Sequence, residues 1–472
     1  MPHAALEELI GLAGLPASAA EQAHIDGDDP VIPTQYRVGA AGAAALAASG
    51  LAAGELWKLR SGRSQTVSVD LRAATASLRS ACYLRINGKP IPMIWDAYSG
   101  FYPVKDGRWV SIHCNFANHR EAAMQVLGNA PDRKTAEAAS LAWDGLALED
   151  AIHAAGGCAG YVRSAQEWAA HPQSAAVATQ PLLEILRIGD APPEPLPAGS
   201  RPLSGLRALD LTRVLAGPTC ARTFAEHGAD VLKITAAHLP DSGMVELDTG
   251  IGKLSARLDL RTEIGTDTLR SLAETCDVFS QSYRPGALAA RGFSPEALAR
   301  LRPGIVCVTL SAWGTSGPWH ERRGFDSIVQ CVSGMAHASG TAAKPSLLPV
   351  SAIDYVSGYL MALGAMAALA RRAREGGSWL VRVSLARTGQ WILDRGLVPP
   401  QALAGVPGDL PEEEIARLCT EVDAPDGRIR YLKPVVSMPD TPPYWTRPPV
   451  PLGYHAPVWP EKSSAGSSGA KA

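Results

Sequence analysis

Short apolar runs alternate with longer helix-forming runs through the second half of this chain. Residues 206–211 are apolar and short enough for a buried strand, and residues 216–227 carry helix-forming side chains up to Gly228. Residues 229–234 predict a second strand, and a glycine and a proline stand where the first strand turns into the helix. The pattern therefore predicts a β-turn-α-β unit.

The alternation continues over residues 203–395, which favours a mostly parallel sheet with helices on both faces. In such a sheet, ligands bind in the crevice beyond the carboxyl ends of the strands. We therefore expect the loops after Leu211, Phe279 and Leu310 to meet at one edge of the sheet. The loop 212–218 is the first place to look for a site.

An Ala-rich helical run and a strand also occur near the start of the chain, at residues 38–60 and 65–71. Residues 352–385 align with them without a gap at an offset of 314 residues, so the same helix-strand unit occurs twice. The residue that matches Asp354 in the first copy is Ala40. We expect the first copy to contribute packing and no reactive carboxylate.

Alternating residues on either side of the turn 105–108 predict a β-hairpin, followed by helical patterns. A proline-rich stretch closes this region. The expected fold class is α/β, with a large Rossmann-like domain built on a mostly parallel sheet and a smaller α+β domain. The expected parts are an N-terminal segment with the partial repeat (1–84), the small α+β domain (85–190), a proline-rich linker (191–202), the large domain (203–395), a returning tail (396–460) and a disordered end (461–472).

Proline recurs through the tail from residue 427 to residue 457. Because proline cannot donate a hydrogen bond to a sheet, we expect this stretch to be extended and to form no central strand. A short helix with an acidic first turn is expected just before it, ending at Leu418.

Composition narrows the class of protein. The chain is 46% hydrophobic and 19% charged with a net charge of -2, so it can form more than one core and has no excess charge to attract nucleic acid or a membrane surface. Its eight cysteines form no CxxC pair, which favours buried free thiols. The first residues resemble no signal or transit peptide, and we expect no membrane-spanning run. The expectation is a cytoplasmic protein without a metal site.

A series of short motifs adds a family resemblance. These are LDLTRVLAGP (209–218), GADVLKI (228–234), RLDLR (257–261), CDVFSQSYRPGAL (276–288), LSAWGTSGP (310–318) and GFDSIVQCVSG (324–334), followed by Asp354 before a helix. In this order and spacing the chain resembles the family III CoA transferases, whose relatives include formyl-CoA and carnitine CoA-transferases and α-methylacyl-CoA racemase. In that family the small domain follows the large one, whereas here it is expected to precede it.

The resemblance implies a role for Asp354. The matching aspartate of the family attacks the thioester carbonyl of an acyl-CoA, giving a mixed anhydride and then an aspartyl-CoA thioester that an acceptor acid resolves. It thus implies a CoA transferase with acyl-CoA as substrate, no permanently bound cofactor and a homodimeric, possibly interlocked assembly, with helix 38–60 in part of the interface. If Asp354 caps the helix that follows it, the first-turn amides would favour its negative charge.

Three groups of residues are expected to contact CoA. The first would border the pantetheine arm, the second would line the adenine and phosphate end, and the third would border the thioester. Arginines in the second group suit phosphate oxygens because their donors form a fork. In that order the groups are Val214, Leu215 and Ala216; Leu258, Arg261, Ser282, Tyr283, Arg284 and Arg291; and Ser311, Ala312 and Trp313.

Two alternatives stay open. The racemase branch of the family carries a histidine in a GHD motif that works with the aspartate as an acid-base pair. The matching motif here is Gly324-Phe325-Asp326, which favours transfer over racemisation or epimerisation. The rearranged halves also fit a non-catalytic CoA-binding scaffold protein. His113 and His119 stand six residues apart, a poor spacing for a metal site.

Overall fold

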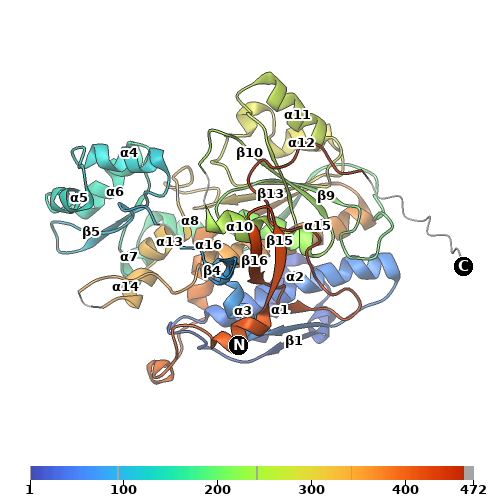
Figure 1. The fold of residues 1–472 in the computed structure, drawn as a ribbon, viewed down its shortest axis with the longest axis horizontal. Helices are drawn as coiled ribbons and strands as arrows, with labels where there is room; N and C mark the ends of the chain where they lie inside the picture. The colour runs from blue at the N-terminus through green and yellow to red at the C-terminus, as the bar shows by residue number, and fades with distance from the viewer. Residues whose placement is uncertain (1, 93–94, 241–242, 342, 462–472) are drawn as a thin grey trace, which may run out of the picture.

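The region in which the sequence predicts parallel strands forms most of a seven-stranded sheet (Figure 1). The computed structural model describes residues 2–92, 95–240, 243–341 and 343–461. Neighbouring strands of the sheet run parallel except the last pair, which is antiparallel. In sheet order the strands are β11 (Leu254–Arg257), β10 (Asp230–Thr235), β9 (Arg207–Leu211), β12 (Val278–Gln281), β13 (Val306–Ser311), β14 (Ser378–Ser384) and β8 (Glu184–Gly189).

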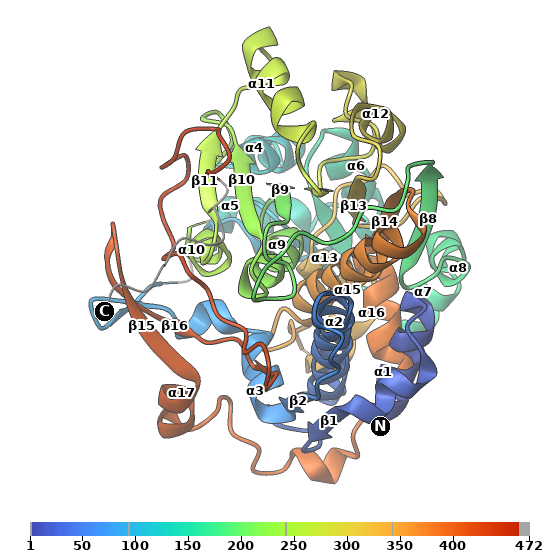
Figure 2. The same cartoon turned by 90° about the vertical axis from the view of Figure 1, so that its right-hand side faces the viewer.

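Helices cover both faces of this sheet, so the predicted α/β fold class is confirmed. The helices α11 (Glu263–Ala273) and α12 (Pro295–Leu301) pack on one face, and α9 (Ala216–Glu226) and α15 (Ala352–Glu375) pack on the other (Figure 2). Because side chains alternate along a strand, Val306 of β13 joins the core beneath α15 while the neighbouring Cys307 joins the core beneath α11.

The helix α2 (Val38–Ser61) forms a further layer, against the side of α15 that faces away from the sheet (Figure 2). The helix α1 (Pro2–Ala13) packs against both. Most residues of α2 are buried within the single chain. The helix is thus mainly a core helix of this chain, and both its part in a dimer interface and the oligomeric state stay predictions.

The two long helices also correct the expectation about membrane-spanning runs. Both α2 and α15 are long and apolar enough to cross a membrane, judged by length and composition alone. Their most apolar windows are 94% and 100% buried inside the protein, as in the core helices of soluble proteins. Burial by the rest of the chain accounts for their composition.

The internal repeat is visible element by element. The helices α2 and α15 begin at Val38 and Ala352 and end at Ser61 and Glu375, an offset of 314 residues at both ends. Each is followed by a strand and a helix, namely β2 (Val67–Asp70) with α3 (Leu71–Ser77) and β14 with α16 (Leu385–Asp394).

A helix-strand contact of the repeat is also conserved between the copies. A Cβ atom built on Gly50 of α2 would lie 2.7 Å from a methyl of Val67, and one on Gly364 of α15 would lie 2.6 Å from a methyl of Val381. These pairs occupy matching positions at the same offset of 314 residues. The two copies therefore share the packing of the helix on its strand.

The hairpin predicted around residues 105–108 belongs to a small antiparallel sheet beside the main body (Figure 1). Three helices pack against this sheet around a separate apolar core. The elements are β5 (Gly100–Pro103), β6 (Trp109–Ile112), β7 (Ala159–Tyr161), α4 (Ala117–Val126), α5 (Arg133–Ser140) and α6 (Gly145–Ala154). β8 also lies in the range expected for the small domain, yet it pairs with β14 in the large sheet.

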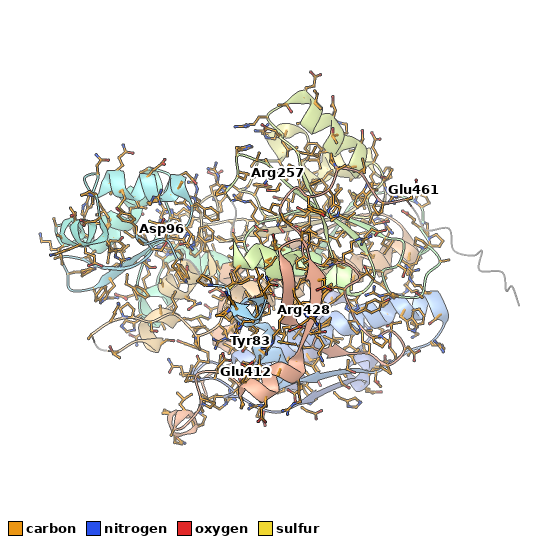
Figure 3. The ribbon with its side chains drawn as sticks, viewed as in Figure 1. Tyr83, Asp96, Arg257, Glu412, Arg428 and Glu461 are labelled. Atoms are coloured by element: carbon orange, nitrogen blue, oxygen red, sulfur yellow. The ribbon has the colours of Figure 1, made fainter. Side chains whose placement is uncertain are left out.

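The tail contains an inner strand that the sequence analysis excluded. The strand β15 (Cys419–Ala424) pairs with β16 (Gly427–Leu432), and β16 pairs with β3 (Arg85–Ile86) of a hairpin whose other strand is β4 (Lys89–Pro90), so β16 lies inside this sheet. Arg428 on β16, which is labelled in Figure 3, forms an ion pair with Glu421 on β15. The exclusion was wrong because the prolines begin only after Lys433, whereas residues 427–432 contain none.

A third small sheet joins β1 (Ala23–Asp26), β2 and β17 (Val436–Ser437) and links the first and last parts of the chain. The expected disordered end at 461–472 lies almost wholly outside the described residues. All eight cysteines are free, and six of them are buried, as predicted. The remaining helices are α7 (Ala165–Ala169), α8 (Pro172–Ala178), α10 (Met244–Gly250), α13 (Asp326–Val332), α14 (Met335–Ser339) and α17 (Glu412–Leu418).

The close packing of α15 on β14 gives a stability prediction. Gly364→Ala places a methyl 2.6 Å from Val381, so it should lower the free energy of unfolding by about 1–3 kcal/mol. The matched control is Gly54→Ala in α2, where the nearest atom to the new methyl lies 4.0 Å away and alanine should be neutral or stabilising by up to ~1 kcal/mol. Urea denaturation measures both, and equal effects of the two substitutions would contradict the packing.

Candidate active site

The loop between β9 and α9 lies beside the start of α15. Val214 in this loop has a φ of 68°, and Leu215 leads into α9. A Cβ on Gly358, one turn after Asp354, would lie 2.5 Å from the carbonyl oxygen of Ala216. Only glycine permits this approach. The close contact holds the loop against the first turns of α15.

A buried ion pair fixes the same loop from below. Lys253 Nζ donates to Asp210 Oδ2 at 2.7 Å and to the carbonyl oxygen of Pro218 at 2.8 Å. The other oxygen of Asp210 accepts the backbone amide of Thr212 at 3.0 Å. Because both charges are fully buried and hydrogen-bonded, this pair holds the strand end and the helix start in one arrangement.

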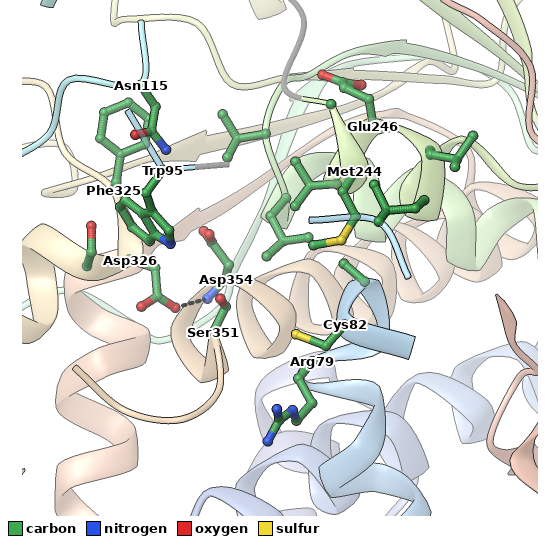
Figure 4. A pocket seen from close by; sticks show the side chains of 18 of the residues that line it. Arg79, Cys82, Trp95, Asn115, Met244, Glu246, Phe325, Asp326, Ser351 and Asp354 are labelled. Carbon is green, nitrogen blue, oxygen red and sulfur yellow. Dashed lines mark hydrogen bonds between the residues drawn. The ribbon is translucent and has the colours of Figure 1, made fainter. Parts of the chain in front are cut away.

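Asp354 lines a cavity of about 1010 Å³, as its predicted role requires (Figure 4). It is the third residue of α15, and only 8% of its surface is exposed. Val214 and Leu215 line the same cavity. The structure therefore brings together the carboxyl and two of the three residues expected beside the pantetheine arm, while Ala216 is buried in the first turn of α9.

The carboxylate that caps α15 is Asp326, at the start of α13. Its Oδ2 accepts the backbone amide of Asp354 at 3.0 Å, and its Oδ1 accepts a hydrogen bond from the side-chain amide of Gln330. The prediction that Asp354 caps the helix is wrong because the helix begins two residues earlier, at Ala352. The sequence analysis considered Asp326 only as part of a motif that lacks histidine.

Burial favours the protonated form of both carboxyl groups, and the charge of Asp326 adds to this effect at Asp354. Burial raises the pKa of Asp354 well above its usual range, and the nearby charge of Asp326 raises that pKa further. Burial also raises the pKa of Asp326, to about 6, although the backbone amides of Asp354 and Ile353 and the side chain of Gln330 oppose the shift. The first-turn amides thus stabilise negative charge on Asp326, contrary to the expectation for Asp354.

The small domain supplies an aromatic wall of the cavity. The ring of His113 stacks on Phe325, with ring centroids 3.8 Å apart and planes 10° from parallel. Burial lowers the pKa of His113 to about 3, so the imidazole is neutral at physiological pH. The ring centroids of His113 and His119 lie 6.4 Å apart. Among the described residues, no three or more His, Cys, Asp or Glu side chains are grouped so that they could hold a metal ion.

A second buried network ties the N-terminal segment to the site. The hydroxyl of Tyr355, the residue after Asp354, lies 3.0 Å from Ser80 Oγ. Ser80 and Arg222 of α9 both donate to Asp248 of α10, at 2.7 Å each. Because these groups come from four distant segments, the network fixes the first turn of α15 against α9 and α10.

The other residues expected to contact CoA do not line this cavity. Arg261 pairs with Asp259 at 2.7 Å, and Arg291 donates to the carbonyl of Leu260, so these two arginines lie near each other. Trp313 is 1% exposed and packs near Trp319. Leu258 lies in the core beneath α11, Tyr283 packs against that core, and Arg284 lies in the loop after β12. The other three residues are held by backbone amides. Ser282 Oγ accepts the amide of Arg213, Ser311 Oγ accepts that of Gly314, and the carbonyl oxygen of Ala312 accepts that of Ala386.

Comparison with known proteins finds a family match for part of the chain. Residues 203–419 match the family "CoA-transferase family III". This region belongs to that family. The match begins with β9 and its loop and extends past α15, so it contains Asp326 and Asp354.

Individual relatives match only part of the chain. It is 34% identical to the acetyl-coenzyme A transferase nodX of Hypoxylon pulicicidum, over 41% of this chain and 34% of that protein. It is 32% identical to the probable fatty acyl-CoA transferase Rv3272 of Mycobacterium tuberculosis, over 39% of this chain and 51% of that protein. It is 32% identical to the succinyl-CoA:glutarate CoA-transferase of Mus musculus, over 37% of this chain and 43% of that protein. The chain thus spans about half the length, or less, of these curated relatives.

Solved structures match over a similar extent. The orthorhombic crystal form of Rv3272 from M. tuberculosis is 31% identical, with a TM-score of 0.39, over 41% of this chain and 57% of that one. A CAIB/BAIF family protein from Brucella suis is 26% identical, also with a TM-score of 0.39, over 42% and 56%.

The raised pKa of Asp354 gives a prediction for stability against pH. Because its pKa is higher in the folded protein than the ordinary 3.8, the folded state retains a proton that the unfolded state releases. The contribution of Asp354 to the free energy of unfolding therefore falls as the pH rises above about 4. Asp354→Asn removes this loss of stability. The free energy of unfolding of the variant, relative to that of the wild type, should therefore rise between pH 4 and pH 8, by up to about 1.4 kcal/mol per pH unit.

Thermal or urea unfolding at several pH values measures this difference. The control is Asp190→Asn, which removes an exposed carboxyl that pairs with Arg187 at the surface, and it should not reproduce the pH-dependent gain of Asp354→Asn. A constant difference between Asp354→Asn and the wild type across this pH range would contradict the buried, protonated state of Asp354.

Proposed function

We propose that this protein is a CoA transferase that moves CoA from an acyl-CoA donor to a carboxylic acid acceptor. The observation that carries the proposal is the position of Asp354, whose carboxyl lines the cavity bordered by the loop after β9. The family membership of residues 203–419 supports it. The acyl-CoA and the acceptor acid are substrates, and the proposal needs no permanently bound cofactor.

The proposed chemistry uses one carboxylate as a covalent nucleophile. An oxygen of Asp354 attacks the thioester carbonyl, the C–S bond breaks, and CoA leaves as a thiolate from a mixed anhydride. The thiolate then attacks the aspartyl carbonyl, which releases the first acid and leaves aspartyl-CoA. The acceptor carboxylate repeats these steps in reverse, forming the new acyl-CoA and restoring Asp354.

The cavity suits these steps for two reasons. Most of the residues that line it are apolar, which disfavours water beside the anhydride and so slows its hydrolysis. The carboxyl of Asp354 has no hydrogen-bond partner among the described side chains, so the oxygen is free to react once ionised. Its amide is already held by Asp326, which fixes the direction of the side chain from the helix.

The neutral imidazole of His113 favours transfer over racemisation. A racemase needs two groups that exchange a proton with the α-carbon, and a histidine with a pKa of about 3 is a weak base. Phe325 stands where the racemase branch carries its histidine. The protein should therefore exchange no α-proton of a bound acyl-CoA with deuterated solvent.

The first test is covalent trapping at Asp354. Incubation with acyl-CoA followed by hydroxylamine should mark Asp354 in the wild type, as read by peptide mass spectrometry. Asp354→Asn should abolish the mark and lower CoA transfer by at least about 10³-fold, because the nucleophile is lost. Asp190→Asn is the control and should behave as the wild type. Full CoA transfer by Asp354→Asn would show that Asp354 is not the nucleophile. If neither the wild type nor any variant transfers CoA, a non-catalytic scaffold protein would be favoured.

The second test is the pH dependence of adduct formation. Only ionised Asp354 attacks, and its pKa is raised, so the rate should increase with pH. The half-maximal rate should fall well above the ordinary aspartate value of 3.8. Rapid-quench measurements over the range in which circular dichroism shows a folded protein supply the profile. A half-maximal rate near pH 4 would contradict the buried setting of Asp354.

A further inference from the structure

Apolar side chains from four separate segments form much of the cavity wall (Figure 4). One segment is the β3–β4 hairpin and the chain just after it, and another is the first turn of α10. The third precedes α15, and the fourth belongs to the tail. The residues are Ile86, Ile91 and Pro92; Met244, Val245 and Leu247; Leu347, Leu348, Pro349 and Val350; and Val450, Pro451 and Leu452.

Arg79 is the one basic side chain among the described residues that line the cavity, and it is already engaged. Its guanidinium pairs with Asp409 at 3.4 Å and donates to the carbonyl oxygen of Gly408 at 3.1 Å. Figure 4 shows this guanidinium directed away from Asp354. Arg79 is therefore not placed to receive a second carboxylate of a substrate bound at Asp354.

The remaining charged side chains of the lining are acidic. Glu246 pairs with Lys233 at 2.7 Å, and Asp96 pairs with Arg120 at 2.8 Å, so neither offers a cation to the cavity. Asp326, Asp354 and Asp426 add further carboxyl groups. A substrate carboxylate placed deep in this cavity would lose its hydration without gaining a positive partner, and it would meet like charge.

We propose that the acyl group carried by this enzyme is apolar and has a single carboxyl, the one that forms the thioester. This inference rests on the proposed function. A cavity of about 1010 Å³ lies at the upper end of the range for small-molecule pockets, so it accommodates part of the pantetheine arm together with an alkyl or aryl chain of several carbons. Dicarboxylic acyl groups, such as those after which the succinyl-CoA:glutarate CoA-transferase of Mus musculus is named, are disfavoured.

The test compares two donors of equal chain length, octanoyl-CoA and suberyl-CoA, which differ by a terminal carboxylate. Release of free acid in a single turnover without acceptor measures the donor half-reaction alone. Octanoyl-CoA should react with a kcat/KM at least about 100-fold higher, because a buried polar group without a partner gives strong discrimination. Equal rates, or a preference for suberyl-CoA, would overturn the inference and leave the proposed transfer intact.

Two substitutions locate the origin of the preference. Val245→Arg puts a cation on the half-buried apolar wall and should reduce the ratio of octanoyl-CoA to suberyl-CoA by at least about 10-fold. Leu146→Arg is the control, because Leu146 is half exposed on α6 outside the cavity, and it should leave the ratio unchanged. Arg79→Leu should also leave the ratio unchanged, whereas a collapse of suberyl-CoA turnover in this variant would identify Arg79 as a carboxylate partner and overturn the inference.

Binding of the free acids separates this inference from the proposed function. Calorimetry should show octanoate binding to the wild type more tightly than suberate, with the difference reduced by Val245→Arg. If no acyl-CoA is turned over but this order of binding holds, the transferase proposal fails and the apolar specificity of the cavity stands. If suberate binds as tightly as octanoate, or neither binds, the apolar specificity is wrong.

Discussion

The hydrogen bond from the Asp354 amide to Asp326 is the interaction on which the site depends. It satisfies a backbone donor at the start of a buried helix, where an unpaired amide would be costly. Since Asp326 from another helix provides the acceptor, the side chain of Asp354 does not have to serve as the cap. The carboxyl is thus left facing the cavity, buried and close to a second carboxyl, and both effects raise its pKa.

The first copy of the repeat shows the same capping without the reactive group. Asp29 accepts the amides of Gly39 and Ala40, at 3.0 and 2.9 Å, at the start of α2. These two residues match Ile353 and Asp354 of α15 at the repeat offset. Ala40 has no carboxyl, and it is buried in the core with 4% of its surface exposed. One copy therefore retains the helix as packing material, and the other carries the cavity.

Much of the fold could be predicted from local pattern. The β9-α9-β10 unit, the long helices and the hairpin at residues 105–108 each follow from apolar periodicity and turn residues within one segment. The strand β16 was missed because the prolines of the tail masked a short alternating stretch. The pairing of β8 with β14 joins segments almost 200 residues apart, and no local pattern encodes it.

The candidate site was predictable only in its centre. Asp354 and the loop at Val214 and Leu215 follow from motif order and from the geometry of parallel sheets. The cap at Asp326 and the stacking of His113 on Phe325 depend on how distant segments meet, which one sequence does not reveal. The most direct measurement is a crystal structure after soaking with an acyl-CoA. The account predicts continuous density from the Asp354 carboxyl to an acyl or CoA group in this cavity, and CoA bound elsewhere with Asp354 unmodified would contradict it.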